Sequence, residues 1–312
     1  MIPLSPSPLV LVADHPGQSA GIALYLKRDD LLHPTVAGSK WRKLEPIVLL
    51  IQEQQYAGIL TYGGPFSNHL QAVAAAGKAY GFPTVGVVRG VAANLSNPTL
   101  SFAQECGMQL IAVTKQEYDL GENSPRLRAI AARFADYFQL PEGGATRLAV
   151  DNCRRITWEI QRQLPADRYQ SLVVCVPAGT GCTAAGVIAG LGDAGATWIF
   201  PAVNYGVDEA TIQDYLSDCP SSASPDFLFI RDYTFGGFAV HHKALMAFTR
   251  TFRDQTGILL DPIYTSKMMF GVFDLLLKGQ FAPGSIVVAL HTGGLQGWDG
   301  FRQRFGEMEI FK

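Results

Sequence analysis

Lys40 stands in a segment whose residue types could do covalent chemistry. It follows Gly38-Ser39 at the expected start of a helix and precedes Arg42 and Lys43. A lysine held near a helix N-terminus and a bound cofactor is disfavoured as a cation, and this lowers its pKa toward the neutral amine that forms imines. Most lysines at helix starts are solvated, so the segment alone decides little. Arg42 and Lys43 are expected to be surface or substrate-gate residues.

A glycine-rich turn further along the chain has the pattern of a phosphate site. The apolar run 173–176 leads into Gly179-Thr180-Gly181, and a helix opens at Cys182. Such a junction offers free backbone N–H groups and the positive end of a helix dipole, to which hydroxyl groups add. The turn also satisfies G-x-G-x-x-A, but the acidic residue that a dinucleotide site needs about 20 positions on is absent. A glycine turn that serves close packing alone is the other alternative.

Ser67 and Asn68 begin a helix directly after a strand that ends in Gly63-Gly64. Serine at this place is a typical N-cap, and the cap alone would explain it. If the helix end faces a ligand, its N–H groups could bind a substrate carboxylate, and Ser67 could carry a proton or act as a nucleophile. The segment does not match the G-x-S-x-G turn of hydrolases, so that class gains no support.

The pattern of apolar residues along the chain predicts the strands and helices that would position these segments. Apolar, β-branched runs alternate with helical stretches, which predicts an α/β architecture of parallel sheets covered by helices. The expected strands are residues 22–27, 58–62, 84–88, 109–113, 171–176, 197–201 and 285–290. The expected helices are residues 43–54, 68–80, 98–106, 125–138, 152–163, 182–191, 241–255 and 267–277. Ligands of open α/β sheets bind at the carboxyl ends of strands, so the turns could form one site.

Composition limits the classes of function. The 312 residues, of which 48% are hydrophobic and 17% charged, suggest about two domains. A net charge of −2 without a basic stripe argues against nucleic-acid and anionic-membrane partners. No apolar run reaches the roughly 20 residues that span a bilayer, and residues 1–17 lack a positive leader, so a cytoplasmic protein is expected. The scattered cysteines predict reduced thiols and no metal site; they are Cys106, Cys153, Cys175, Cys182 and Cys219.

Taken together, these segments resemble the fold-type II pyridoxal-5′-phosphate (PLP) family that contains 1-aminocyclopropane-1-carboxylate (ACC) deaminase and D-cysteine desulfhydrase. Residues 27–30 and 38–45 resemble its R-D-D and G-N-K-x-R-K-L-E stretches, with Ser39 in place of asparagine. Residues 63–69 match G-G-x-x-S-N-[QH], and residues 141–144 match P-E-G-G. Residues 261–269 resemble D-P-V-Y-[TE]-x-K-x-M, and residues 291–294 match H-[LT]-G-G. Order and spacing hold over nearly the whole chain.

The resemblance implies a fold and an assembly. The fold would be α/β, with two open, mostly parallel twisted sheets flanked by helices, similar to the tryptophan synthase β subunit. Residues 43–151 would form a smaller domain, and residues 1–42 with 152–312 a larger PLP-binding domain. The family also implies a homodimer that acts on a small amino-acid substrate.

The resemblance also implies roles for individual residues. Lys40 would hold PLP as a Schiff base and shuttle the α-proton, with Tyr264 stacked near the substrate to assist proton transfer. Asn68 would bind the phenolic oxygen of PLP, while Ser67 and the helix N-terminus would hold the substrate carboxylate. The phosphate would rest on Gly179, Thr180, Gly181, Cys182 and Thr183. Thr265 and Thr292 would lie toward the cofactor ring, and His69 and Phe238 toward the substrate.

Three positions favour one activity within the family. Thr265 replaces the glutamate of ACC deaminase, and Thr292 is a second neutral hydroxyl. The weaker electron sink suits β-elimination better than the opening of a cyclopropane ring. His69 and Thr292 also match the desulfhydrase version, whereas Phe238 stands at or near the place of a substrate-facing tyrosine. Loss of that phenol would cost roughly 10²–10⁴ in rate if it acts as an acid or base.

The predicted function is therefore that of a PLP-dependent carbon–sulfur lyase or deaminase. It would release pyruvate and ammonia from D-cysteine or a similar β-substituted amino acid. Two alternatives stay open. One is ACC deaminase, which gives α-ketobutyrate and ammonia, and the other is a PLP-binding protein with little turnover, which the altered pocket at Phe238 suggests.

Overall fold

The larger of two sheets is built from both ends of the chain. The computed structural model describes residues 5–36, 38–90, 95–165, 171–204, 206–217 and 226–306. In this sheet the strand order is β1-β2-β10-β7-β8-β9, and all neighbours are parallel except β1 and β2. The strands are β1 (Leu9–Leu11), β2 (Ala23–Lys27), β7 (Leu172–Ala178), β8 (Gly195–Pro201), β9 (Phe227–Phe229) and β10 (Ile286–Leu290). The central strand β10 is buried along its whole length, as expected for a strand covered on both faces.

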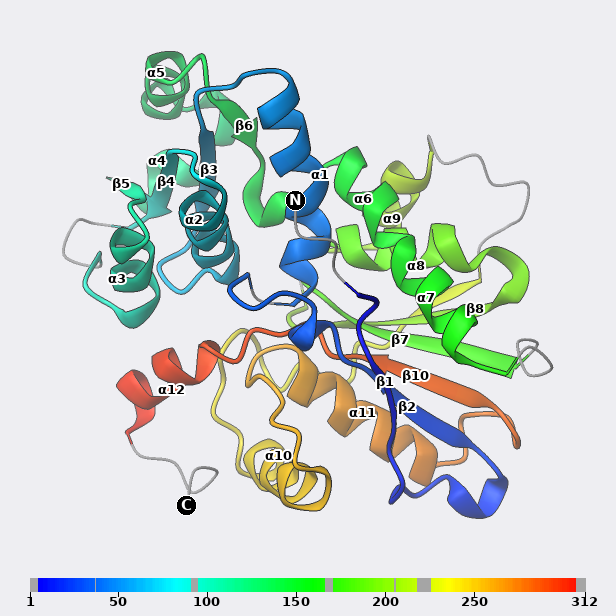
Figure 1. Cartoon of the computed structure of the whole chain (residues 1–312). Helices are drawn as coiled ribbons and strands as arrows, with labels where there is room; N and C mark the ends of the chain where they lie inside the picture. Colours follow the sequence, from blue (N-terminus) through cyan, green and yellow to red (C-terminus); the bar gives the residue numbers. More distant parts are fainter. Residues whose placement is uncertain are drawn as a thin grey trace.

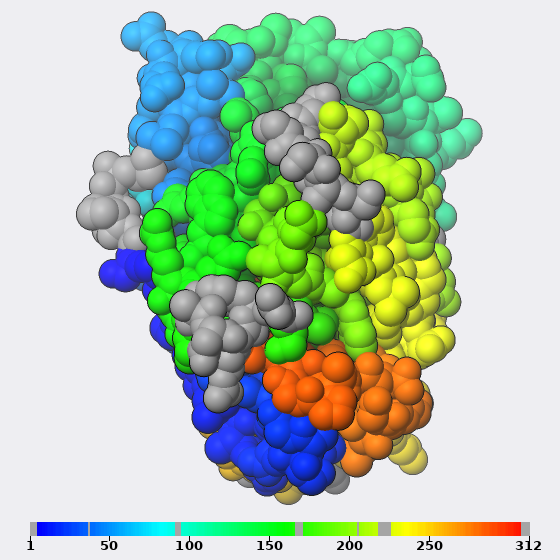
Figure 2. Space-filling model, turned by 90° about the vertical axis from the view of Figure 1, so that its right-hand side faces the viewer, coloured from blue at the N-terminus to red at the C-terminus, as the bar shows by residue number. Residues whose placement is uncertain are grey.

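Helices cover both faces of this sheet (Figure 1). One face is covered by α6 (Arg147–Cys153), α7 (Arg155–Gln163), α8 (Cys182–Leu191) and α9 (Glu209–Leu216). The other is covered by α10 (Lys243–Thr256) and α11 (Thr265–Leu277), whose apolar side chains form a second core. The short helix α12 (Gly297–Phe305) follows β10. In the space-filling view the blue N-terminal segment and the orange segment lie side by side, in agreement with the pairing of β2 and β10 (Figure 2).

The smaller sheet is formed by a continuous part of the chain. Its four strands run parallel in the order β5-β4-β3-β6. They are β3 (Ile59–Gly63), β4 (Thr84–Arg89), β5 (Gln109–Val113) and β6 (Phe138–Leu140). The helices around this sheet are α1 (Ser39–Glu53), α2 (Asn68–Tyr80), α3 (Pro98–Glu105), α4 (Lys115–Asp119) and α5 (Pro125–Arg133). Two apolar clusters pack on it, one of them contributed largely by α1, α2 and α3.

The predicted fold class is confirmed: two mostly parallel sheets are flanked by helices. The predicted division at residues 43 and 151 stays a prediction, and both positions fall inside helices, α1 and α6. Several expected bounds were wrong. The helix expected over residues 125–138 ends at Arg133, because Phe138 pairs with Ile59 in β6. The helix expected from residue 43 begins at Ser39.

No helix among the described residues is long and apolar enough to cross a membrane. Within the same residues there is no group of three His, Cys, Asp or Glu side chains that could hold a metal ion. Four of the cysteines are free thiols, and Cys219 lies outside the described residues.

Candidate active site

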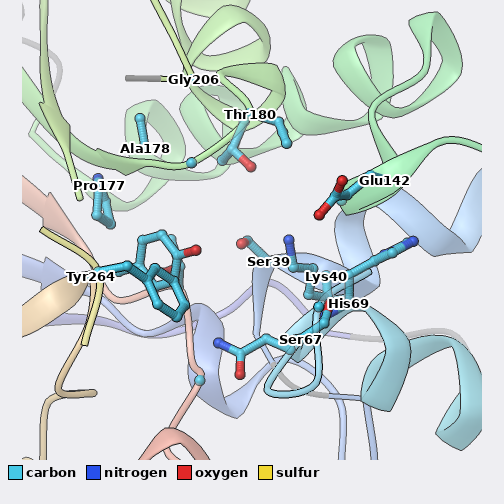
Figure 3. Close-up of a pocket in the computed structure, with 18 of the residues that line it drawn as sticks. Ser39, Lys40, Ser67, His69, Glu142, Pro177, Ala178, Thr180, Gly206 and Tyr264 are labelled. Atoms are coloured by element: carbon cyan, nitrogen blue, oxygen red, sulfur yellow. The ribbon is translucent and has the colours of Figure 1, made fainter. Parts of the chain in front are cut away.

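A cavity of about 620 Å³ opens where strands of both sheets end. Its wall comes from the turns after β3, β7, β8 and β10, from the last residue of β4, and from the start of α1 (Figure 3). The arrangement follows the rule that ligands of parallel α/β sheets bind at the carboxyl ends of strands. Most of the predicted site residues line it: Lys40, Ser67, Asn68, His69, Gly179, Thr180, Gly181, Thr183, Phe238, Tyr264 and Thr292.

Lys40 is the second residue of α1 and lines the cavity, half-buried. Burial, assisted by the charge of Lys43, lowers the pKa of its amine to about 7. Near neutral pH about half of such amines are neutral and can act as nucleophiles. Gly38 makes this position possible: it has a φ of +56°, and a Cβ there would lie 1.8 Å from the backbone oxygen of Thr292. Only glycine lets α1 start so close to the turn that follows β10.

The start of α2 forms the opposite side of the cavity. Ser67 is its N-cap, and the hydroxyl oxygen accepts hydrogen bonds from the N–H groups of His69 (3.2 Å) and Leu70 (3.3 Å). The side-chain oxygen of Asn68 accepts one from Gln296 at 3.0 Å. The hydroxyl proton of Ser67 remains available to a ligand, and the helix dipole favours an anion such as a carboxylate at this place.

The turn between β7 and α8 fits a phosphate group. Gly181 is the N-cap of α8, and no side chain there binds the first N–H groups of the helix. The amine of Lys43 is directed at this turn, 3.5 Å from the hydroxyl of Thr180 and 3.3 Å from the backbone oxygen of Gly143. Backbone N–H groups, a threonine hydroxyl and a buried ammonium together are suited to a phosphate dianion.

Lys43 and Arg42 correct the sequence analysis, which expected both near the surface or at a gate. Lys43 is buried and reaches the phosphate turn; its spacing of three from Lys40 places the two on one face of α1 and could have revealed this. Arg42 is also buried. Its guanidinium lies 2.7 Å from Asp29 and 2.5 Å from Glu159, and Lys27 lies 2.8 Å from the same glutamate. Residues 27–30, part of the stretch that resembles the family, therefore help to hold α1 in place through these ion pairs.

Cys182 and Thr265 do not line the cavity. Cys182 is fully buried and contributes to the phosphate turn only as the first residue of α8. The hydroxyl of Thr265 donates to the carboxylate of Asp261 at 2.5 Å and accepts from the backbone N–H of Asp261 at 2.8 Å. The Asp261 carboxylate thus engages the hydroxyl of Thr265, and the place of Thr265 beside a cofactor ring stays a prediction. Thr292 does reach the wall.

Asp261, which the sequence analysis passed over, shapes the turn that presents Tyr264. Its buried carboxylate accepts hydrogen bonds from the N–H groups of Ile263, Tyr264 and Thr265, at 2.7–2.9 Å. Burial, together with the negative charges of Asp261 and Glu142, raises the pKa of the Tyr264 phenol far above neutral. The phenol is therefore a proton donor at neutral pH.

His69 is held as a neutral ring. The Thr61 hydroxyl donates to the backbone oxygen of Leu140 (2.9 Å), so it accepts from the Nε2–H of His69 at 2.7 Å. Nδ1 is then a bare acceptor, and no described residue bonds to it. Burial, with the charges of Lys40 and Lys43, lowers the pKa of His69 well below its usual value. His69 lines the cavity, and its Nδ1 atom is buried in the wall.

The rim carries Phe238, which the sequence analysis placed toward the substrate, and three residues that it had not placed there: Phe66, Arg89 and Glu142. Phe66 and Phe238 are partly exposed, and the ring of Phe238 meets that of Tyr264 edge-on at 6.2 Å. Arg89 and Glu142 supply the charges, and the Glu142 carboxylate accepts a hydrogen bond from the Tyr118 hydroxyl at 2.8 Å. Glu142 belongs to the Pro-Glu-Gly-Gly motif, which was the available signal.

Comparisons with known proteins agree with this geometry. A family model described as "Pyridoxal-phosphate dependent enzyme" matches residues 3–293. A D-cysteine desulfhydrase of Salmonella paratyphi A is 27% identical over 307 residues, which cover 93% of this chain and 92% of that protein. A bifunctional D-cysteine desulfhydrase/ACC deaminase of Arabidopsis thaliana is 25% identical, over 90% of this chain and 75% of that protein. A solved ACC deaminase homologue superposes with a TM-score of 0.82 at 23% identity, covering 97% of this chain and 93% of that one.

Proposed function

The chain belongs to the family of pyridoxal-phosphate-dependent enzymes, and on that premise we propose that it is a lyase that cleaves a β-substituent from a small amino acid. One observation carries the proposal: a lysine amine with a pKa of about 7 shares a cavity with a turn built for phosphate. Bound PLP supplies an aldehyde and an electron-withdrawing ring. The relatives named for D-cysteine desulfhydrase and ACC deaminase support a lyase or deaminase.

Different residues of the cavity would bind the phosphate, bind the substrate carboxylate and transfer protons. Lys43, Thr180 and the first N–H groups of α8 would hold the phosphate. Ser67 and the start of α2 would hold the substrate carboxylate. Lys40 would take the α-proton, because its amine is neutral near pH 7. Tyr264 would give a proton to the departing group, since its phenol stays protonated.

For cysteine the proposed reaction consumes water and gives pyruvate, ammonia and hydrogen sulfide. The C–S bond breaks with its electron pair on sulfur, and water hydrolyses the remaining enamine to the keto acid. Of the two threonines expected near the cofactor ring, Thr265 and Thr292, only Thr292 lines the cavity, and its hydroxyl is neutral. This favours a leaving group that departs readily over the opening of an unactivated ring.

A keto-acid screen tests the proposal. Purified protein is reconstituted with PLP and assayed with D- and L-cysteine, β-chloro-D-alanine and ACC, and products are identified as pyruvate or α-ketobutyrate. We expect pyruvate and a visible cofactor band, both lost in Lys40→Ala. α-Ketobutyrate from ACC as the main product would favour the deaminase instead, as the name of the Arabidopsis relative suggests. A cofactor band that shifts with amino acids without any keto acid would indicate a binding protein with little turnover.

Borohydride reduction followed by peptide mapping locates the attachment. We expect the label on Lys40, and on neither Lys43 nor Lys267. A label on another lysine would overturn the assignment of the site. We also propose a homodimer, which the molar mass from light scattering checks.

A further inference from the structure

Arg89 is a cation at the cavity rim for which the proposed function has no use. It is the last residue of β4, it is exposed, and it lines the cavity. Its guanidinium lies over the ring of Tyr118, 5.6 Å from the ring centre. Among the described residues, no carboxylate forms an ion pair with Arg89, and the Glu142 carboxylate at the same cavity accepts a hydrogen bond from the Tyr118 hydroxyl. The guanidinium thus lines the cavity without an ion-pair partner among the described residues.

The position of Arg89 relates it to the substrate rather than to the cofactor. A Cβ built on Gly64 would lie 3.7 Å from Nη2 of Arg89, the only atom within 4 Å. Gly64 starts the turn that ends at Ser67, closed by a hydrogen bond of 3.1 Å from the N–H of Ser67 to the oxygen of Gly64. Arg89 therefore flanks the turn that would hold the substrate carboxylate. The phosphate turn has its own cation, Lys43.

The surroundings suit a substrate longer than cysteine. Phe66 and Phe238 both line the cavity and expose 42% and 43% of their surface. Their rings can cover methylene groups that lead from the reacting carbon to the rim. A planar guanidinium pairs best with carboxylate, sulfonate or phosphate oxygens, and its stacking on Tyr118 limits the orientations it must lose on binding.

We propose that Arg89 is a specificity residue that selects amino acids carrying a second anionic group on the side chain. The inference rests on the proposed function, since it takes the α-carboxylate to be bound at the start of α2. It predicts that an anionic side chain is preferred over a neutral one of equal size and that the preference disappears with the guanidinium.

Two substrate analogues isolate the charge. S-carboxymethylcysteine and S-carbamoylmethylcysteine have nearly the same shape and differ by one negative charge. Each is used as the D- and the L-enantiomer, and keto-acid release gives kcat/KM for the PLP-loaded enzyme. Titration of the cofactor absorbance gives Kd as a second readout that needs no turnover. The variants are Arg89→Gln and Arg89→Lys, and Arg126→Gln removes an exposed arginine of α5 that does not line the cavity.

We expect the wild-type enzyme to prefer the anionic analogue by about tenfold or more in kcat/KM and in Kd, as one charge-assisted pair would give. Arg89→Gln should bring the ratio to about one, mainly through KM; Arg89→Lys should keep part of it, and Arg126→Gln all of it. A ratio that Arg89→Gln leaves intact, with both analogues weakened alike or neither affected, overturns the proposal. If the wild-type enzyme releases no keto acid from cysteine, β-chloro-D-alanine or either analogue, the proposed lyase function fails, while the ratio of Kd values still tests Arg89.

Discussion

At the scale of single residues, the amine of Lys40 should control how fast the apoenzyme takes up its cofactor. Its pKa of about 7 lies below the usual 10.5 because of burial and the neighbouring charge of Lys43. The neutral fraction therefore rises as the pH rises through 7. The rate of PLP uptake, followed by absorbance from pH 5.5 to 9, should increase with pH and level off above about pH 8.

Removing the charge of Lys43 should shift this profile. In Lys43→Met the pKa of Lys40 should rise, because burial remains but the repulsion from the charge of Lys43 is gone. The midpoint of PLP uptake should therefore move to higher pH. A shift of the midpoint to lower pH, measured under the same conditions, would contradict the assigned repulsion.

Thr265 and Thr292 can be separated by one substitution each. Thr265→Val removes a hydroxyl that bonds the buried carboxylate of Asp261 at 2.5 Å, so it should cost about 1–3 kcal/mol of unfolding free energy. The visible cofactor band should keep its position, because Thr265 does not line the cavity. Thr292→Val should instead shift the band. Urea unfolding and absorbance spectra measure the two effects, and a band shift in Thr265→Val would return that residue to the cofactor.

At the scale of elements, the approach of α1 to the turn after β10 depends on Gly38. Gly38→Ala would place a Cβ 1.8 Å from the backbone oxygen of Thr292, so the helix start must move. We expect loss of the cofactor band and a clear fall in Tm. Gly192→Ala is the matched control, since Gly192 (φ +53°, ψ −131°) has nearly the backbone conformation of Gly38 (φ +56°, ψ −141°) but nothing within 4 Å of its Cβ. It should cost only about 1–3 kcal/mol, the strain of a sparsely populated backbone conformation. Equal effects would show that the close approach is unimportant.

The elements also show what the sequence could predict. The helices that begin at Asn68 and Cys182 have the expected starts, because a cap or a glycine turn marks each locally. Strands β1, β6 and β9 were missed, since three residues are too short to display a period. The places of Arg42 and Lys43 depend on partners more than 100 residues away, Glu159 and Thr180. For Lys43 the spacing from Lys40 was the one local signal, and no local pattern reports the burial of Arg42.

At the scale of the whole molecule, the buried cluster around Arg42 joins β2, α1 and α7. Arg42→Met would leave Asp29 and Glu159 buried without their main counter-charge, which typically costs about 3–5 kcal/mol. Arg155→Met breaks a more exposed ion pair, with Glu45 at 2.6 Å, and should cost at most about 1 kcal/mol. Urea unfolding at pH 7 compares the two variants, and similar losses would contradict a special role for the cluster.

The same cluster should make stability depend on pH. Burial alone would raise the pKa of Glu159, but hydrogen bonds and charge from Arg42 and Lys27 outweigh it and lower the pKa below 4.5. A carboxyl with a lowered pKa stabilises the fold above its unfolded pKa, and the contribution is lost as the pH falls through the folded value. Unfolding free energy of the wild-type protein should therefore fall below about pH 4.5. The fall should be shallower in Arg42→Met; an unchanged slope would contradict this linkage.

The pairing of β2 with β10 has a consequence for synthesis. Residues 23–27 leave the ribosome long before their neighbour in the sheet, residues 286–290. The four parallel strands between residues 59 and 140 can assemble before residues 286–290 are translated, whereas the larger sheet lacks β10 until then. A nascent chain must keep the apolar edges of β2 and β7 from associating with other chains during that interval. Capture of the cofactor would then require that the chain has been translated through the turn after β10, which lines the cavity.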